Sequence, residues 1–332
     1  MELNYFLNVT QKGNSQEYIE KLGDGTLLIY SPTSMKKINI NNDSIMMVNW
    51  HNITKKVDKI QKFINKNKEI KEVVSFGGGS TIDIGKYISY KLNIKFTCIP
   101  TMLSTNSYAT NKVALINSRQ KDTLEAKMPD KIIVDEKLLK LSKNENLYGL
   151  TDVLSIYTAL YDWKIANEDI NEEINIEIYK MAENLLLDVL EFIKNNTLDQ
   201  ITQNNMKLFE FIGIAGYITN LYGTGRPESG SEHIMAKEIE SKIDIPHGIS
   251  VALGIIMMSI IQGRKTDEII DTVNKIEVLN KKDNYGINKK MIKECLENIK
   301  PREGRYTIVD RYVKSNVCKD DILKDFFMKV NI

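Results

Sequence analysis

The chain has 332 residues, of which 42% are hydrophobic and 27% charged, so the composition is that of a globular protein long enough for two domains. A net charge of +1 gives no electrostatic reason to expect a nucleic acid or an anionic membrane as partner. The three cysteines are far apart and form no CxxC pair, which argues against a disulfide framework and against a cysteine zinc site.

The N-terminus has no basic segment followed by a long apolar core, so no signal peptide is predicted. The longest apolar stretch, residues 249–261, is too short to cross a bilayer and predicts a buried helix. Together with the separated cysteines, these features lead us to expect a cytoplasmic protein.

The first part of the chain alternates short β-rich runs with helical patterns. Apolar runs predict strands at residues 26–30, 44–50, 72–76, 94–99 and 131–135. Helical spacing predicts helices at 52–67 and from the glycines at 77–79 to about residue 90. This alternation favours a parallel sheet covered by helices, and a hairpin is expected from residues 112–117 and 122–127.

The composition changes near residue 147. Residues 150–212 contain neither glycine nor proline, and apolar side chains recur there at helical spacing. We therefore predict an α/β N-terminal domain over residues 1–146 and an all-α C-terminal domain over residues 147–332.

A glycine loop, Gly77-Gly78-Gly79, stands between a predicted strand and a predicted helix. Glycines let the backbone approach a phosphate closely, and a helix N-terminus offers free amides and a positive dipole end. The spacing is neither that of a Walker A loop nor that of GxGxxG, because Ile82 replaces the third glycine. A tight turn without a ligand is the alternative. No acid follows the second strand, so NAD and NADP stay equally open.

Two of the three histidines, His233 and His247, lie in consecutive segments that a turn could bring together. Imidazole is a common ligand for zinc, nickel and ferrous iron, and Asp152 is the best candidate for a third ligand. Each residue also has an ordinary explanation, since an aspartate in a first helical turn complements the dipole and a histidine near a helix start is often exposed. The third histidine, His51, is interpreted as a surface residue.

Seven segments, in the same order, resemble segments of the family of iron-type alcohol dehydrogenases, glycerol dehydrogenases and dehydroquinate synthases. They are GGGSTIDIGKYISYKL, IPTMLSTNSYAT, MPDKIIVDEKLL, GLTDVLSIYTALYDWKIA, GTGRPESGSEH, PHG and PREGRYTIVD. The sn-glycerol-1-phosphate dehydrogenase branch is the one they resemble most. The resemblance implies a dehydroquinate synthase-like fold, with a Rossmann-like domain, a helical domain and the cleft between them.

The same resemblance implies a set of site residues. Asp152, His233 and His247 would bind one divalent metal, which is zinc, nickel or iron. The residues that would bind NAD(P)H are Gly77, Gly78, Gly79, Ser80, Asp83, Thr101 and Ser104.

The implied activity is metal-dependent, NAD(P)H-linked reduction of dihydroxyacetone phosphate to sn-glycerol 1-phosphate, or of a close phosphorylated pair. Lys112 and Arg226 are predicted to bind the substrate phosphate, with Arg305 as a further candidate. Many relatives have an acid at the position of Asn106, which we place beside the substrate. Asparagine takes no proton at neutral pH, so we expect the proton path or the substrate contact to depart from the family's.

Three alternatives stay open at this point. The chain is a cyclase of the dehydroquinate synthase type, a polyol or alcohol dehydrogenase with an unphosphorylated substrate, or a binding protein that has kept the fold without catalysis. The expected partner is a small phosphorylated substrate, with no nucleic acid and no membrane, and we expect a homo-oligomer, a dimer or larger.

Overall fold

The computed structural model describes residues 8–118, 120–315 and 318–332. The chain divides into two compact units. The first unit comprises Met1–Asn146 and Asn205–Tyr217, and the second comprises Leu147–Asn204 and Ile218–Ile332. The proposed division into domains 1–146 and 147–332 stays a prediction, and residues 205–217 are the segment in which it differs from these units.

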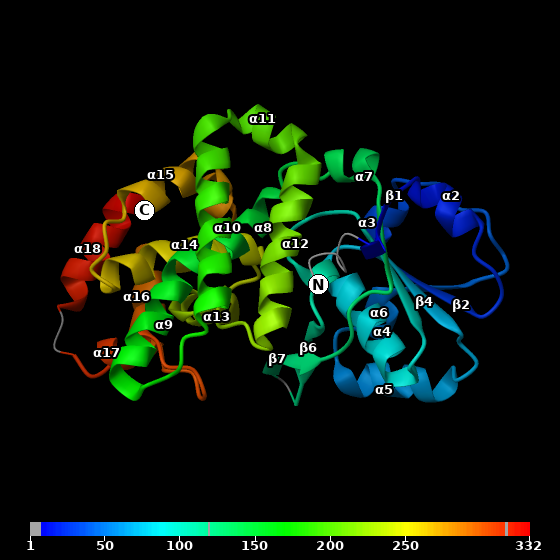
Figure 1. Cartoon of the computed structure of the whole chain (residues 1–332), viewed down its shortest axis with the longest axis horizontal. Helices are drawn as coiled ribbons and strands as arrows, with labels where there is room; N and C mark the ends of the chain where they lie inside the picture. The colour runs from blue at the N-terminus through cyan, green and yellow to red at the C-terminus, as the bar shows by residue number, and fades with distance from the viewer. Residues whose placement is uncertain (1–7, 119, 316–317) are drawn as a thin grey trace. The chain divides into compact units, whose positions relative to one another are not determined.

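The first unit contains a six-stranded sheet in which every neighbouring pair of strands is parallel (Figure 1). Its order is β1-β8-β5-β4-β2-β3. The strands are β1 (Thr10–Lys12), β2 (Thr26–Tyr30), β3 (Met46–Asn49), β4 (Glu72–Gly77), β5 (Lys95–Pro100) and β8 (Lys131–Val134). The predicted parallel α/β architecture is therefore confirmed. The edge strand β1 was not predicted.

The strand order reverses between β2 and β4. From β2 the chain continues to β3 at one edge, and from β4 it continues to β5 and β8 on the other side. The connections that leave β2 and β4 therefore diverge, which in open α/β sheets marks the usual place for a ligand. Gly77–Gly79 leave β4 at this point, and the amide of Ser31, just after β2, donates to the carbonyl of Phe76 at 3.0 Å.

Both faces of the sheet are packed. On one face a buried apolar cluster includes Leu28, Val74 and Phe76 from the strands and Leu138 from outside the sheet. The helices that lie wholly in this unit are α2 (Ser15–Glu20), α3 (Pro32–Met35), α4 (Trp50–Ile53), α5 (Val57–Lys66), α6 (Gly79–Leu92), η1 (Ser107–Ala109) and α7 (Glu136–Lys140). On the other face, a Cβ atom added to Gly85 of α6 would lie 2.0 Å from the Ser75 hydroxyl oxygen, so α6 packs directly on β4.

Two predicted elements need correction. The helix expected over residues 52–67 is interrupted, because Thr54 takes a left-handed φ of 64° and ends α4 before α5 begins. The expected hairpin exists as β6 (Lys112–Asn117) and β7 (Gln120–Glu125), which pair antiparallel, but its second strand begins and ends two residues earlier than predicted.

The second unit is built from helices throughout its described part, as predicted for the all-α region. They are α8 (Leu147–Leu154), α9 (Ile156–Ile170), α10 (Ile176–Asn195), α11 (Leu198–Gln203), α13 (Ser231–Lys242), α14 (His247–Ile261), α15 (Asp267–Lys275), η2 (Val278–Tyr285), α16 (Lys289–Asn298), α17 (Ile308–Tyr312) and α18 (Lys319–Val330). Among the described residues, no helix is both long and apolar enough to cross a membrane.

Helix α12 (Asn205–Tyr222) belongs to both units, because residues 205–217 pack with the first and the rest with the second. Its part in the first unit is tied to the loop after β5. The buried hydroxyl of Tyr108 donates to the carbonyl of Phe209 at 2.7 Å, and the two rings stack with centroids 4.7 Å apart. The Asn146 amide also donates to the Asn205 side-chain oxygen at 2.6 Å.

Candidate metal centre and cofactor-binding loop

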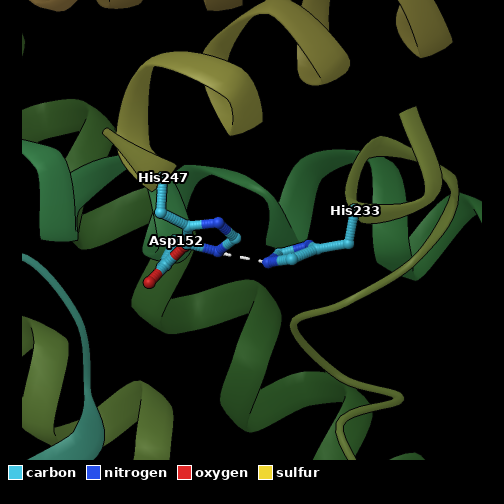
Figure 2. A group of neighbouring side chains, drawn as sticks. All are labelled: Asp152, His233 and His247. Atoms are coloured by element: carbon cyan, nitrogen blue, oxygen red, sulfur yellow. Dashed lines mark ion pairs between the residues drawn. The ribbon is translucent and has the colours of Figure 1, made fainter. Parts of the chain in front are cut away.

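Three helices of the second unit bring one side chain each to a single point, as Figure 2 shows. Asp152 comes from α8, His233 from the first turn of α13, and His247 is the first residue of α14. One ligand atom from each lies within 4.8 Å of the others. The Nε2 atoms of His233 and His247 lie 3.7 and 3.5 Å from Asp152 Oδ1.

Two glycines of α14 allow this convergence. A Cβ atom on Gly248 would lie 2.5 Å from the Cβ atom of Tyr148 in α8. A Cβ atom on Gly254 would lie 2.3 Å from the backbone carbonyl oxygen of Glu232 in α13. Both separations are far below van der Waals contact, so α14 approaches its two neighbours more closely than any larger residue would permit. The sequence thus sets His247 beside residues from both other helices.

The three side chains fit a divalent cation. Asp152 is only 7% exposed, and its Oδ1 atom is buried without a hydrogen-bond partner in the described structure. That oxygen is the one that faces both Nε2 atoms. A buried polar oxygen without a donor is costly unless a ligand satisfies it. One carboxylate and two imidazoles suit zinc, nickel and ferrous iron alike.

Each histidine also has a glutamate carboxylate beside Nδ1, the ring nitrogen that does not face Asp152. His233 Nδ1 lies 2.7 Å from Glu232 Oε1, and His247 Nδ1 lies 2.5 Å from Glu240 Oε1. An ionised carboxylate only accepts hydrogen bonds, so the ring nitrogen facing it carries the proton. In the neutral form of each ring, Nε2 then keeps its lone pair and faces Asp152.

The electrostatics of the centre are those of a site that attracts positive charge. Burial lowers the pKa of His233, but the carboxylates of Asp152 and Glu232 outweigh that effect and raise it to about 9. A second buried acid, Asp162, accepts the amides of Ser231 and Ile308 at 2.6 and 2.9 Å. Burial, followed by the charge of Glu232, raises the pKa of Asp162 to about 7. Excess negative charge therefore surrounds the start of α13.

The glycine loop lies in the first unit at the strand-order reversal. Helix α6 begins at Gly79 with Gly78 as its N-cap and no side-chain cap, so its first amides have no intrahelical acceptor. A Cβ atom on Gly79 would lie 2.7 Å from the Thr105 hydroxyl oxygen. Thr101 is buried against the loop, and its amide donates to the Gly77 carbonyl at 3.1 Å. The loop is suited to an anion such as a pyrophosphate.

The other residues expected at the cofactor lie around this loop. Ser80 is in the first turn of α6 and Ser104 in the segment after β5, and both are partly exposed. The carboxylate of Asp83 accepts the amide of Ala114 at 3.1 Å and lies 3.9 Å from the Lys55 ammonium. Asp83 therefore links α6 to the hairpin, and its contact with a cofactor stays a prediction.

The residues expected at the substrate lie in both units. In the first, Asn106 is the N-cap of η1 and is half-buried, and the Lys112 ammonium forms an ion pair with Glu125 across the hairpin. In the second, Arg226 is only 2% exposed, and its guanidinium lies 2.8 Å from the Glu172 carboxylate. Arg226 also donates to the carbonyl of Tyr306 at 2.9 Å.

Arg305 lies against the same loop that leads into α13. Its guanidinium donates to the carbonyl of Ser229 at 2.5 Å, and within the described part of the chain no carboxylate lies at ion-pair distance from it. Burial, followed by the charges of Arg302 and Arg226, lowers the pKa of Arg305 to about 10. Arg305 is thus a half-buried cation that forms no ion pair with a described residue.

Sequence reasoning missed three residues that the structure places in important positions. Glu232 precedes His233 directly, so its role was open to prediction from adjacency. Glu240 reaches His247 across the turn at Pro246, a contact that no periodicity indicates. Lys86 is fully buried in α6 and binds backbone carbonyls of the segment after β5.

Known proteins resemble the chain in sequence and in fold. Residues 30–142 match the family model described as iron-containing alcohol dehydrogenase. Glycerol-1-phosphate dehydrogenase [NAD(P)+] of Pyrococcus horikoshii is 28% identical over 320 residues, which cover 92% of this chain and 91% of the relative. The enzyme of the same name from Picrophilus torridus is 30% identical, with 74% of this chain and 71% of the relative covered.

Among solved structures, a probable glycerol dehydrogenase from Sinorhizobium meliloti matches with a TM-score of 0.66 and 17% identity, over 97% of this chain and 96% of that one. The fold is therefore that of the iron-type alcohol and glycerol dehydrogenases. The chain belongs to the glycerol-1-phosphate dehydrogenase branch of the iron-containing alcohol dehydrogenase family.

Proposed function

We propose that this protein is a metal-dependent dehydrogenase that uses NAD(P)H to reduce dihydroxyacetone phosphate to sn-glycerol 1-phosphate. The relatives named glycerol-1-phosphate dehydrogenase [NAD(P)+], which align over most of the chain, support the reaction and the cofactor. The convergence of Asp152, His233 and His247 on one point is the structural observation that carries the proposal. The alternative of a cyclase is not favoured, because these relatives are dehydrogenases.

Each part of the proposed site has a separate chemical role. Asp152, His233 and His247 hold one divalent ion, which when bound polarises the substrate carbonyl. The amides at the start of α6 bind the cofactor pyrophosphate, and the nicotinamide supplies the hydride. The chain's own contribution is to fix these groups in position and to present a partly buried, electron-rich set of ligands.

The substrate phosphate requires cations that are not already neutralised. Arg226 and Lys112, the two residues predicted first, are paired with Glu172 and Glu125. Arg305 has no such partner among the described residues, which makes it the strongest of the three candidates. A guanidinium can bind a phosphate through two parallel hydrogen bonds, which a neutralised side chain does less well.

Asn106 is proposed to orient the substrate by hydrogen bonding. Its side chain offers donors and an acceptor but exchanges no proton at neutral pH. The proton that completes the product alcohol therefore comes from water or from another hydroxyl group. An Asn106→Asp variant tests this role, since an added acid changes the pH profile of kcat if it joins the proton path.

The decisive assay is oxidation of NADH and NADPH by dihydroxyacetone phosphate, with zinc, nickel or iron supplied in turn. Stoichiometric oxidation is expected, whereas a cyclase shows no net oxidation of the cofactor. His247→Ala should lose metal and activity together while the protein stays folded, and His51→Ala is the matched control, since His51 lies in α4 stacked on Trp50. Full activity in His247→Ala refutes the proposed centre.

The phosphate-binding proposal is tested separately. Arg305→Ala should raise the KM for dihydroxyacetone phosphate at least tenfold more than the KM for unphosphorylated dihydroxyacetone, because a charge-assisted contact contributes about 1.5–3 kcal/mol. Arg302→Ala is the control, since Arg302 is exposed only three residues away. Equal effects of Arg305→Ala on both ketones would remove this arginine from the phosphate site.

Two further expectations remain proposals. A homo-oligomer, a dimer or larger, is expected, and light scattering of the purified protein measures it. A cytoplasmic location and the lack of nucleic-acid and membrane partners are expected from composition alone.

A further inference from the structure

We propose that Glu232 and Glu240 are positioning residues of the metal centre. Each carboxylate accepts the Nδ1–H of one histidine and so keeps the Nε2 lone pair of that ring aimed at the ion. The inference rests on the metal centre proposed above and names the residues on which its affinity depends. Neither glutamate has a ligand atom among the three that converge.

The geometry of both histidines is the same, although the glutamates come from different places. Glu232 is the neighbour of His233 in the first turn of α13, and Glu240 lies in the last turn of that helix, across a turn from His247. In each ring Nδ1 faces a glutamate and Nε2 faces Asp152. The same orientation from two independent positions argues against chance contacts.

Glu232 is held in place by hydrogen bonds to both of its carboxylate oxygens. It is 0% exposed, and its Oε1 atom accepts the Gly230 amide at 2.5 Å. Its Oε2 atom lies 2.6 Å from the Thr158 hydroxyl oxygen, which donates to it. Within the described residues no lysine or arginine lies at ion-pair distance from Glu232, so its charge is directed to His233. A buried anion without a lysine or arginine favours a cation at the neighbouring site.

Glu240 also contacts helix α14 through its carboxylate. Its Oε1 atom accepts the Ser250 hydroxyl at 2.8 Å, and Ser250 lies one turn after His247 on α14. The carboxylate is thus fixed by the same helix that carries the histidine. Because its side chain is 17% exposed, Glu240 tolerates replacement better than the fully buried Glu232 and is the better position for a test.

The chemical consequence concerns affinity and ligand strength. A carboxylate behind an imidazole fixes the tautomer and orientation of the ring and makes Nε2 a stronger donor to a metal. Loss of such a partner typically weakens metal binding about 10- to 100-fold. A variant that lacks the carboxylate of Glu232 or Glu240 would still contain all three metal ligands. Weaker metal binding in that variant would therefore not come from the loss of a ligand.

The experiment measures metal binding without substrate. Protein stripped with a chelator is titrated with Zn²⁺ against a chromophoric chelator, and Co²⁺ is added separately to record the visible absorption bands. Glu240→Gln should raise the Kd for Zn²⁺ about tenfold and Glu240→Leu up to about 100-fold, with altered Co²⁺ bands in both. Glu232→Gln should weaken Zn²⁺ binding at least as much as Glu240→Gln.

Glu238→Gln is the matched control, because Glu238 lies on the same helix and, in the described part of the chain, forms no hydrogen bond or ion pair with either histidine. An equal Kd for the Glu238 and Glu240 variants would overturn the inference, since only overall charge would then matter. If Glu232→Gln does not fold, the Glu240 series decides. His247→Ala separates the two proposals: retained Zn²⁺ binding there contradicts the centre itself, whereas loss there with an unchanged Glu240→Leu contradicts only the positioning role.

Discussion

Lys86 offers a stability prediction that is independent of the reaction. Its side chain is 0% exposed, and its ammonium donates to the carbonyls of Ser107, Thr110 and Lys112 at 2.5, 2.8 and 2.9 Å. Burial lowers the pKa of Lys86 from 10.5 to about 8, despite the opposing charge of Asp83. One buried cation therefore ties helix α6 to the segment after β5.

The expected effect of Lys86→Met follows from two opposing contributions. Methionine fills much of the same volume but donates nothing, and three carbonyls that lose this donor cost about 1–3 kcal/mol each. The difference between 10.5 and about 8 means that the buried charge itself destabilises the fold by about 3 kcal/mol at pH 7, which the variant recovers. The net loss of unfolding free energy is then about 0–6 kcal/mol at pH 7, because about 3–9 kcal/mol is lost at the three carbonyls and about 3 kcal/mol is recovered.

The sign of the change in this deficit with pH follows from the direction of the pKa shift. Below about pH 8 the lysine is protonated in both the folded and the unfolded protein, so the cost of burying the charge is fully present. Between pH 8 and 10.5 the folded protein gives up this proton first, and wild type gains stability relative to the variant. The deficit of Lys86→Met should therefore grow by about 3 kcal/mol over this range.

Urea unfolding of wild type and Lys86→Met at pH 7, 8, 9 and 10, followed by circular dichroism, measures this deficit. Lys91→Met is the control, because Lys91 is exposed on the same helix and should show only a small deficit. A Lys86→Met deficit that is constant or shrinks as the pH rises would refute the reasoning.

Three other predictions concern the second unit. Gly248→Ala places a Cβ atom 2.5 Å from Tyr148, so α14 must move. We expect the unfolding free energy to fall by about 1–3 kcal/mol and Zn²⁺ binding to weaken. Gly23→Ala is the control and should change neither, because no atom lies within 4 Å of the added Cβ atom. Burial raises the pKa of Asp162 from 3.8 to about 7, so the folded protein binds this proton more tightly than the unfolded protein does. The unfolding free energy of wild type should therefore fall by about 4 kcal/mol relative to that of Asp162→Asn as the pH rises from 4 to 7. An equal change with pH in both proteins, measured by urea unfolding, would contradict this. Removal of the metal by a chelator should lower the thermal midpoint, since an ion at 100 times its Kd stabilises by about 2.7 kcal/mol, and an unchanged midpoint argues against a bound ion.

The sheet was predictable where its strands are buried. Parallel strands covered on both faces are continuous apolar runs, so β2 and β4 were recognised from their residues alone. Strand β1 consists of the polar residues Thr10–Lys12 and is a strand only through its pairing with β8, more than 100 residues away. The helix break at Thr54 was missed because neither glycine nor proline marks it.

The candidate site was predictable to the extent that its residues lie in recognisable segments. His233 and His247 stand out in a chain with three histidines, and the resemblance to a known family added Asp152. The partners of these residues come from folding. Glu172 reaches Arg226 from 54 residues away, so the sequence could not indicate that this arginine is neutralised. A cation is easily recognised in a sequence, but the anion beside it is not.

The division of α12 between the units has a consequence for how the protein is made. Residues 205–217 complete the first unit, where the Tyr108 hydroxyl and ring pack on Phe209. A ribosome that has released only the first 146 residues has therefore not yet supplied the segment that covers Tyr108. The first unit of the nascent chain must wait for some seventy further residues, most of them belonging to the second unit, before its own core is closed.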